Sequence, residues 1–369
     1  MAELMTIHNE WKSRPADERI AGPTPLYTAR DIANRRRLES DQAIVQMRDL
    51  TAAPVEGNDD ALAIISPSGV PMLPTNWAFN QIARAAGCPG SFLSTLPSDL
   101  AADVLNHRLA QVPAEQRAQI YRGKHAGATA LRAVTGPDYG RIYNSQILAA
   151  LADQVGDGFT GRWRVPGIRG TKLKEVTKEN TTIFMSDRDL VLCLADEDNR
   201  IEMKGRRDGK PGSLARGVII GNSEVGAGVF WITGFLFDFV CANRIIWGAE
   251  EVKEIRVRHT SGAPDRWMAD LMPQIKAYSD ASTRTIEVKV KAAQSKMLGP
   301  KEEIDGFMGK WFTGPQVDKV HVAHGLAEHR EILSLWDVVT GATEYAKTIE
   351  YQDQRLVVEK AAGEIMALV

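Results

Sequence analysis

The sequence predicts an α+β fold, with a mainly antiparallel sheet, flanking helices and a helical C-terminal region. Two observations predict it. β-rich runs at residues 181–185 and 190–195 are separated by four residues, a connection length found in hairpins. The last third of the chain instead has apolar residues at helical spacing, for example Leu335 and Trp336 followed by Val339.

Length and composition are those of a globular protein. The chain has 369 residues, of which 44% are hydrophobic and 25% are charged, so it can bury a large core. Residues 1–60 have scattered prolines and little periodicity, and we expect an N-terminal arm there. We expect residues 61–255 to form an α+β core domain and residues 256–369 a mainly helical C-terminal region.

The core domain is predicted to begin with a strand at 61–65 and a turn at 67–69. A helix capped by Thr75 then ends near Gly87, because threonine is a favourable N-cap and glycine commonly ends a helix. The next predicted elements, in chain order, are a helix from Ser98, a strand at 128–134, a helix capped by Asn144, strands at 181–185, 190–195, 218–221 and 229–233, and an apolar helix at 235–244. The C-terminal helices are predicted at 263–281, 285–297, 327–340 and 345–368.

The cysteines and the apolar segments bear on the compartment. Cys88, Cys193 and Cys241 are odd in number and far apart, as is typical of thiols in a reducing compartment, so we expect a cytoplasmic protein. The polar, acidic start of the chain does not resemble a secretory signal. The apolar stretch at 225–247 is interrupted by Asp238, which is costly inside a bilayer, so we expect it to be core and expect no membrane partner.

Glycines after a predicted strand invite comparison with a dinucleotide-binding loop. Gly221, Gly226 and Gly228 follow the strand at 218–221, but Trp231 stands where that loop needs its third glycine. We therefore interpret this segment as a turn or bulge within a sheet, and expect no nucleotide or other cofactor.

Other candidate catalytic groups were weighed against simpler interpretations. His321, His324 and His329 lack the i, i+4 spacing of a helical zinc pair, so no metal site is predicted. Asp187 and Asp189 on the predicted hairpin turn could hold a divalent ion for phosphodiester cleavage, although acidic turns are common for local backbone reasons. No catalytic residue is assigned, and enzymatic activity stays open.

Local positive charge is the most informative feature, because the net charge of −2 provides no global attraction for nucleic acid. Two basic tracts, at 162–178 and 204–216, flank the predicted hairpin. If they line one groove, their cations would follow the phosphates of a single strand, and an aromatic ring would stack on a base. The residues assigned to this site are Arg162, Trp163, Arg164, Arg169, Lys172, Lys174, Arg206, Arg207 and Lys210, with Tyr139 and Arg258 as weaker candidates. The alternative is that 205–212 is a solvated loop whose cations face only water.

Many short motifs resemble one family, over most of the chain from about residue 76 to 366. They are Trp77-Ala78-Phe79, Cys88-Pro89, Leu131-Arg132-Ala133-Val134, Tyr139, Asn144, Ser186-Asp187, Gly221-Asn222-Ser223-Glu224-Val225-Gly226, Cys241-Ala242-Asn243 and residues 359–363. The chain resembles the family called domain of unknown function 932, whose members occur in phages, prophages and plasmids. The resemblance implies a role in mobile-element biology and transfers no activity or catalytic residues.

These observations lead to a non-enzymatic, phage- or plasmid-type single-stranded DNA-binding protein, possibly one that anneals strands in recombination. Mobile elements often carry annealing proteins built from a curved antiparallel sheet and a helix. The alternative is a protein–protein interaction factor that modulates host defence or replication through the C-terminal helices. A homo-oligomer is expected.

Overall fold

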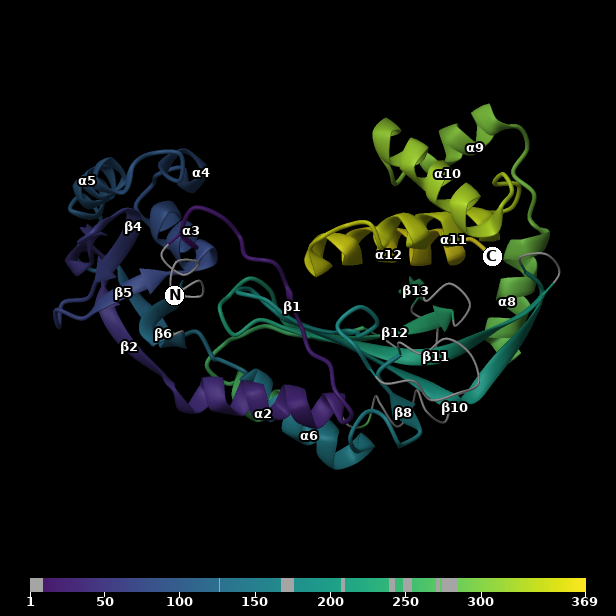
Figure 1. Ribbon diagram of the computed structural model, residues 1–369, viewed down its shortest axis with the longest axis horizontal. Helices are drawn as coiled ribbons and strands as arrows, with labels where there is room; N and C mark the ends of the chain where they lie inside the picture. Colours follow the sequence, from purple (N-terminus) through teal and green to yellow (C-terminus); the bar gives the residue numbers. More distant parts are fainter. Residues whose placement is uncertain are drawn as a thin grey trace.

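The structure is a computed structural model, shown in Figure 1, and it describes residues 9–125, 127–166, 176–206, 210–238, 243–247, 254–269, 273 and 284–369. It contains two β-sheets with helices packed against them and a C-terminal group of helices. The α+β class predicted from the sequence is confirmed.

The first sheet has six strands in the order β2-β6-β7-β5-β4-β3, and only the β5–β7 pair is parallel among its neighbours. Its strands are β2 (Ser40–Gln46), β3 (Thr51–Val55), β4 (Asn58–Ile65), β5 (Pro71–Pro74), β6 (Arg117–His125) and β7 (Ala128–Thr135), with the short 3-10 helix η1 (Met47–Asp49) after β2. Helices α3 (Asn76–Ala85), α4 (Gly90–Leu93) and α5 (Ser98–Leu109) pack on it. We call this sheet and its three helices the N-terminal lobe.

The predicted cap of α3 is confirmed. The Thr75 hydroxyl accepts a hydrogen bond from the Ala78 amide at 3.2 Å, which satisfies one of the free amides of the first turn. Phe79 and Ile82 of α3 and Leu105 of α5 are fully buried in the same apolar cluster. Burial of these faces holds the helices on the sheet.

The second, central sheet is antiparallel throughout. Its strand order is β1-β9-β10-β11-β12-β13, and β8 pairs with β10 while β14 pairs with β12. The strands are β1 (Glu18–Arg19), β8 (Trp163–Arg164), β9 (Ile183–Met185), β10 (Leu190–Arg206), β11 (Lys210–Asn222), β12 (Phe230–Asp238), β13 (Asn243–Ile245) and β14 (Ile255–Val257). The predicted hairpin is confirmed, because β9 and β10 pair with Met185 opposite Leu190.

Helices cover both faces of the central sheet (Figure 1). Leu192 of β10 shares a buried cluster with Leu26 of α2 (Pro25–Leu38) and Leu151 of α6 (Asn144–Val155). The next residue, Cys193, belongs instead to a cluster with Leu356 of α12 (Gln352–Met366). Successive residues of a strand point to opposite faces of the sheet, and helices cover both faces here. This explains why the sequences of these strands are almost continuously apolar.

The same arrangement corrects one predicted element. Of the apolar run expected as a helix at 235–244, residues 235–238 lie in β12 and residues 243–244 in β13, and residues 239–242 lie outside the described part of the chain. Phe235 and Phe237 belong to one buried cluster, and Leu236 between them belongs to another. A strand that is buried on both faces does not alternate between apolar and polar residues. Its sequence pattern therefore cannot be distinguished from that of a buried helix.

The C-terminal region is helical, as expected, but two predicted boundaries are wrong. Its helices are α8 (Arg284–Ser295), α9 (Lys301–Met308), α10 (Gly314–Glu328), α11 (Leu335–Ala346) and α12. The helix predicted at 327–340 is interrupted at His329, which has a left-handed φ of 57°, and α11 starts afresh after its Ser334 cap. The helix predicted at 345–368 is likewise the end of α11 and a separate α12. Residues 263–269 are helical, and most of 270–281 lies outside the described residues.

The N-terminal segment differs from the arm expected over residues 1–60. Within the described part of this segment, α2 packs on the central sheet, and β2 is an edge strand of the N-terminal lobe. Residues 9–19, which we call the strap, run from that lobe to the central sheet. Trp11 is fully buried against Phe79, with ring centroids 5.0 Å apart, and β1 pairs with β9.

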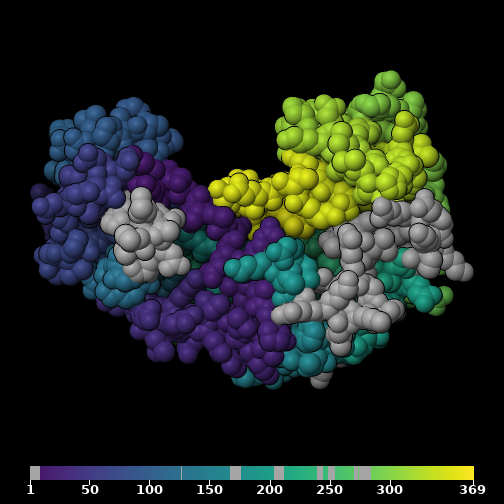
Figure 2. Space-filling view, in the orientation of Figure 1, coloured from purple at the N-terminus to yellow at the C-terminus, as the bar shows by residue number. Residues whose placement is uncertain are grey.

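The molecule is an arc (Figure 1), with the N-terminal lobe at one end and α8–α12 at the other. Figure 2 shows the surface hollowed between the blue helices of the lobe and the yellow C-terminal helices, with the purple strap below. Among the helices of the described residues, none combines the length and hydropathy needed to cross a bilayer.

Candidate functional site

The first predicted basic tract is partly internal. Arg162 donates two hydrogen bonds to the buried Asp196 carboxylate, from Nε at 3.0 Å and from Nη2 at 2.7 Å. The guanidinium of Arg164 lies 3.4 Å from Glu197 and 3.7 Å from Asp198. These two cations therefore already have carboxylate partners within the protein.

Trp163 is 6% exposed and belongs to the cluster under α2 and α6. Its ring has no open face at the surface, so stacking on a base would require the core to open. The residue lies in β8, which pairs with β10 and is held there by that packing.

The second basic tract lies at the far end of the β10–β11 ribbon. Arg206 and Lys210 are cross-strand partners at the last described pair of this ribbon. The remaining predicted contacts, Arg169, Lys172, Lys174 and Arg207, lie outside the described residues. Nucleic-acid binding by these side chains stays a prediction.

The two weaker candidates have different surroundings. The Tyr139 hydroxyl donates to the Ser223 carbonyl at 2.7 Å, and its ring stacks on His259 with centroids 4.8 Å apart. Burial raises the pKa of Tyr139. Arg258 is exposed next to β14. Tyr139 therefore has a structural contact, whereas Arg258 is accessible.

The histidines and the turn carboxylates are dispersed. His321 Nε2 lies 2.6 Å from Asp305, and His324 is fully buried. Asp189 accepts a hydrogen bond from Ser186 within its own turn, at 2.7 Å, and burial raises its pKa to about 6. Within the described residues, no three His, Cys, Asp or Glu side chains are grouped so that they could hold a metal ion.

The glycine-containing motif forms a junction between the two sheets. Its residues 222–226, which we call the junction loop, begin at Asn222, the last residue of β11. The Val225 carbonyl accepts hydrogen bonds from Trp77 Nε1 at 2.9 Å and Gln81 Nε2 at 2.8 Å, both from α3 of the N-terminal lobe. Gly226 has a φ of +82°, a conformation that a residue with a Cβ rarely adopts. The loop therefore attaches the central sheet to α3.

The buried carboxylate of the junction loop is also satisfied. Glu224 accepts a hydrogen bond from the Asn144 amide, at the start of α6, at 2.8 Å. Its second oxygen lies 3.2 Å from Arg132 Nη1 of β7, which also donates to the Tyr121 hydroxyl at 3.1 Å. One carboxylate thus ties together a loop, a helix N-terminus and the first sheet. Several residues on which the family resemblance rests meet here.

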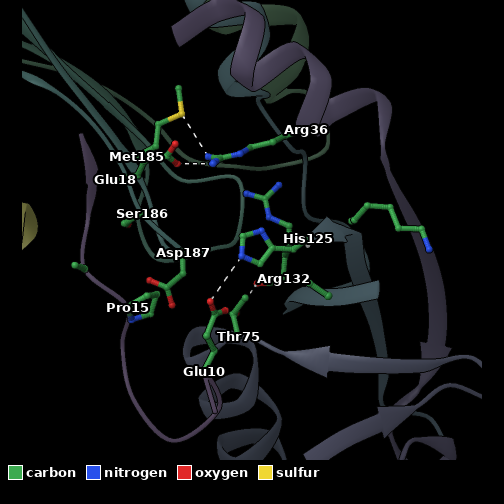
Figure 3. Close-up of a pocket in the computed structure, with 14 residues that line it drawn as sticks. Glu10, Pro15, Glu18, Arg36, Thr75, His125, Arg132, Met185, Ser186 and Asp187 are labelled. Atoms are coloured by element: carbon green, nitrogen blue, oxygen red, sulfur yellow. Dashed lines mark hydrogen bonds and ion pairs between the residues drawn. The ribbon is translucent and has the colours of Figure 1, made fainter. Parts of the chain in front are cut away.

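Beside the junction lies a cavity of about 210 Å³ between the two sheets. Figure 3 shows the strap on one side, with Glu10 and Glu18, and His125 and Arg132 of the first sheet on the other. Asp187, from the turn between β9 and β10, completes the wall. The cavity therefore depends on three segments that are distant in sequence.

Two of the acids that line this cavity are poorly neutralised. The Glu10 carboxylate lies 3.9 Å from His125 Nε2, beyond hydrogen-bond distance. The Asp187 side chain is 4% exposed, and its Oδ1 lies 3.7 Å from Arg188 Nε without a hydrogen-bond partner among the described residues. Its Oδ2 accepts from the Trp77 amide at 3.3 Å.

Burial and mutual repulsion affect how these acids titrate. Burial, together with the nearby Asp187, raises the pKa of Glu10 to about 7. Burial also raises the pKa of Asp187. By contrast, Glu18 has an ion pair with Arg36, and Arg132 has one with Glu224. Glu10 and Asp187 are therefore the acids of the lining with the weakest pairing, and Lys124 of the same lining donates to the Thr129 hydroxyl.

Sequence reasoning missed this cavity. The local patterns indicate only an acidic turn at Asp187 and an N-terminal arm around Glu10. Nothing in the local sequence indicates that Glu10 lies near Asp187. The two residues are more than 170 positions apart, and the strap brings them together in the folded structure. The one signal was that the Ser186-Asp187 turn and Arg132 both belong to the motifs that resemble a family.

Comparison with known proteins identifies one family. The model of the family described as domain of unknown function (DUF932) matches residues 133–361, which is well over half of the chain. No curated protein and no solved structure matches the chain.

Proposed function

The chain belongs to the DUF932 family, whose description specifies no activity, and we propose from its own features that it is a non-enzymatic protein that binds single-stranded nucleic acid. The observation that carries the proposal is the β10–β11 ribbon. It extends to the pair Arg206–Lys210, and the sequence around this end is rich in lysine and arginine. A basic ribbon is suited to following phosphates.

The proposal rests on the second basic tract. Arg162 and Arg164 have internal carboxylate partners, so reversing their charge would disturb folding as well as binding. Arg206 and Lys210 are cross-strand neighbours, so their substitution probes one place on the ribbon. The proposed phosphate contacts also include Arg207, whose neighbourhood lies outside the described residues.

The test is fluorescence anisotropy with single-stranded DNA, duplex DNA and RNA over a salt series. We expect the affinity for a single strand to fall as the salt concentration rises. A plot of the logarithm of the binding constant against the logarithm of the salt concentration should have a slope of about −0.7 per neutralised phosphate. Arg206→Glu with Lys210→Glu should weaken binding about tenfold or more and make the slope shallower.

A matched control is Arg48→Glu with Arg84→Glu, two exposed cations of the N-terminal lobe. This variant carries the same charge change and should bind as well as the wild type. Absence of binding at low salt, or equal loss in both double variants, would reject the ribbon as the binding surface.

A specific observation favours the second candidate, a protein–protein interaction factor. Val322 and Leu326 of α10 are 62% and 73% exposed and lie one helical turn apart. An exposed apolar pair on a C-terminal helix is typical of a protein contact. A partner retained by the wild type but not by Val322→Ser with Leu326→Ser, in a protein that binds no oligonucleotide, would favour this function.

The proposal includes a phage or plasmid setting, a cytoplasmic location, strand annealing and a homo-oligomer. Annealing of complementary strands, measured by fluorescence quenching, should accelerate with the wild type and not with the ribbon variant. Light scattering at micromolar concentration should give a mass above that of the 40.6 kDa chain.

A further inference from the structure

We propose that the cavity between the two sheets binds a small organic cation, a primary ammonium or guanidinium group, between Glu10 and Asp187. Its walls come from the strap, the first sheet and the turn after β9, so the site exists only in the assembled fold. This inference is independent of nucleic-acid binding.

The charges that face the cavity argue for a cation. Arg36 and Arg132, which could attract an anion, are paired with Glu18 and Glu224. Lys124, which also lines the cavity, donates to the Thr129 hydroxyl, and Arg188 lies 3.7 Å from Asp187. An anion would also meet the carboxylates of Glu10 and Asp187, neither of which has a close ion pair. A buried acid is stabilised by N–H donors, and Asp187 Oδ1 has none among the described residues.

The size and composition of the cavity argue for an organic cation. Its volume of about 210 Å³ far exceeds the roughly 10–15 Å³ that a cavity needs to hold one water molecule. The described residues offer no group of three metal ligands. An ammonium or a guanidinium carries several N–H donors, and so could satisfy both Glu10 and Asp187 at once.

Glu10 makes the site sensitive to pH. Burial, together with the nearby Asp187, raises the pKa of Glu10 to about 7, so this acid becomes neutral at lower pH. Lys124 and His125 also line the cavity, and Arg188 lies 3.7 Å from Asp187. Loss of the Glu10 charge weakens cation binding as pH falls.

The first experiment is calorimetric titration of the full chain with agmatine, whose charge is constant between pH 5.5 and pH 8. We expect saturable binding at pH 8, and about tenfold weaker binding at pH 5.5. The neutral probe is the urea analogue of agmatine with its primary amine acetylated. It carries neither an ammonium nor a guanidinium, and it should not bind. Acetyl-Gly-Arg-Gly-amide tests whether an arginine carried by a peptide enters the cavity or only a free amine does.

Two variants locate the site. Asp187→Asn and Glu10→Gln should each weaken agmatine binding about tenfold or more, the typical effect of losing a charge-assisted hydrogen bond. Asp153→Asn, which removes an exposed acid on α6, is the matched control and should bind like the wild type. Circular dichroism of each variant checks folding, and Glu10→Gln removes an acid whose ionisation is unfavourable, so it should fold well.

Three results would overturn the proposal. They are no agmatine binding at millimolar concentration, equal binding of the neutral, acetylated urea analogue, and unchanged affinity in both Asp187→Asn and Glu10→Gln. Oligonucleotide binding is measured separately in the same variants, so failure of this site and failure of the ribbon proposal are distinguishable.

Discussion

Two neighbouring regions between the two sheets differ in how well their buried acids are neutralised. In the junction loop, Glu224 has the Arg132 guanidinium and the Asn144 amide as partners. In the adjacent cavity, Glu10 and Asp187 face each other with only weak neutralisation. The first arrangement stabilises the attachment of the sheets, whereas the second costs stability, as is common at binding sites.

The largest expected effect is at the junction. Glu224→Ala leaves Arg132 and the start of α6 without their carboxylate partner, and should lower the free energy of unfolding by about 3 kcal/mol or more. Chemical denaturation measures this change. Glu56→Ala, at an exposed position, should change stability by less than about 0.5 kcal/mol. A loss below about 1 kcal/mol for Glu224→Ala would remove the contrast between the two regions.

In the cavity, removing a buried acid should raise the free energy of unfolding rather than lower it. Folding raises the pKa of Glu10 from 4.5 to about 7, so the folded state binds the proton more tightly and loses relative stability as pH rises across this interval. Glu10→Gln removes that loss. It should be as stable as the wild type at pH 4 and about 2–3 kcal/mol more stable at pH 8. Urea denaturation of the variant and the wild type at pH 4 and pH 8 measures this difference. A variant less stable than the wild type at pH 8 would contradict the raised pKa of Glu10.

The smallest expected effect sharpens the role of the junction loop. Trp77→Phe removes one donor to the Val225 carbonyl, but Gln81 continues to donate to the same oxygen. The cost should be about 1 kcal/mol, measured by denaturant midpoint. A loss as large as that of Glu224→Ala would mean that the ring packing of Trp77, rather than its hydrogen bond, holds the loop.

Local sequence signals predicted much of the fold. The Thr75 cap, the strand at 128–134 and the β9–β10 hairpin depend on neighbouring residues, and the structure has all three. The helix predicted at 235–244 is wrong for residues 235–238, which form a strand, because burial on two faces removes the alternation of apolar and polar residues that identifies a strand. The break at His329 was missed because its left-handed conformation has no glycine to indicate it.

The candidate site was less predictable than the fold. Clustering of Arg162 and Arg164 suggested a groove, but charge in the sequence does not say which acids lie opposite, and here Asp196 and Glu197 do. Trp163 was assigned to the groove because it lies between two cations in the sequence. An aromatic residue in such a position can equally belong to the core, as Trp163 does here. Pairing partners of β8 are decided by contacts across more than thirty residues.

By itself, the sequence determined the class of fold, the Thr75 cap, the β9–β10 hairpin and a resemblance to the DUF932 family, whereas the cap of α6 is Tyr143 rather than the predicted Asn144. These depend on local geometry and on the spacing of apolar residues. Only the tertiary structure decided which cations are neutralised, that residues 9–19 form a strap, and that Glu10 and Asp187 share one cavity. Burial and electrostatic pairing depend on segments far apart in the chain, and no local pattern specifies which of those segments meet.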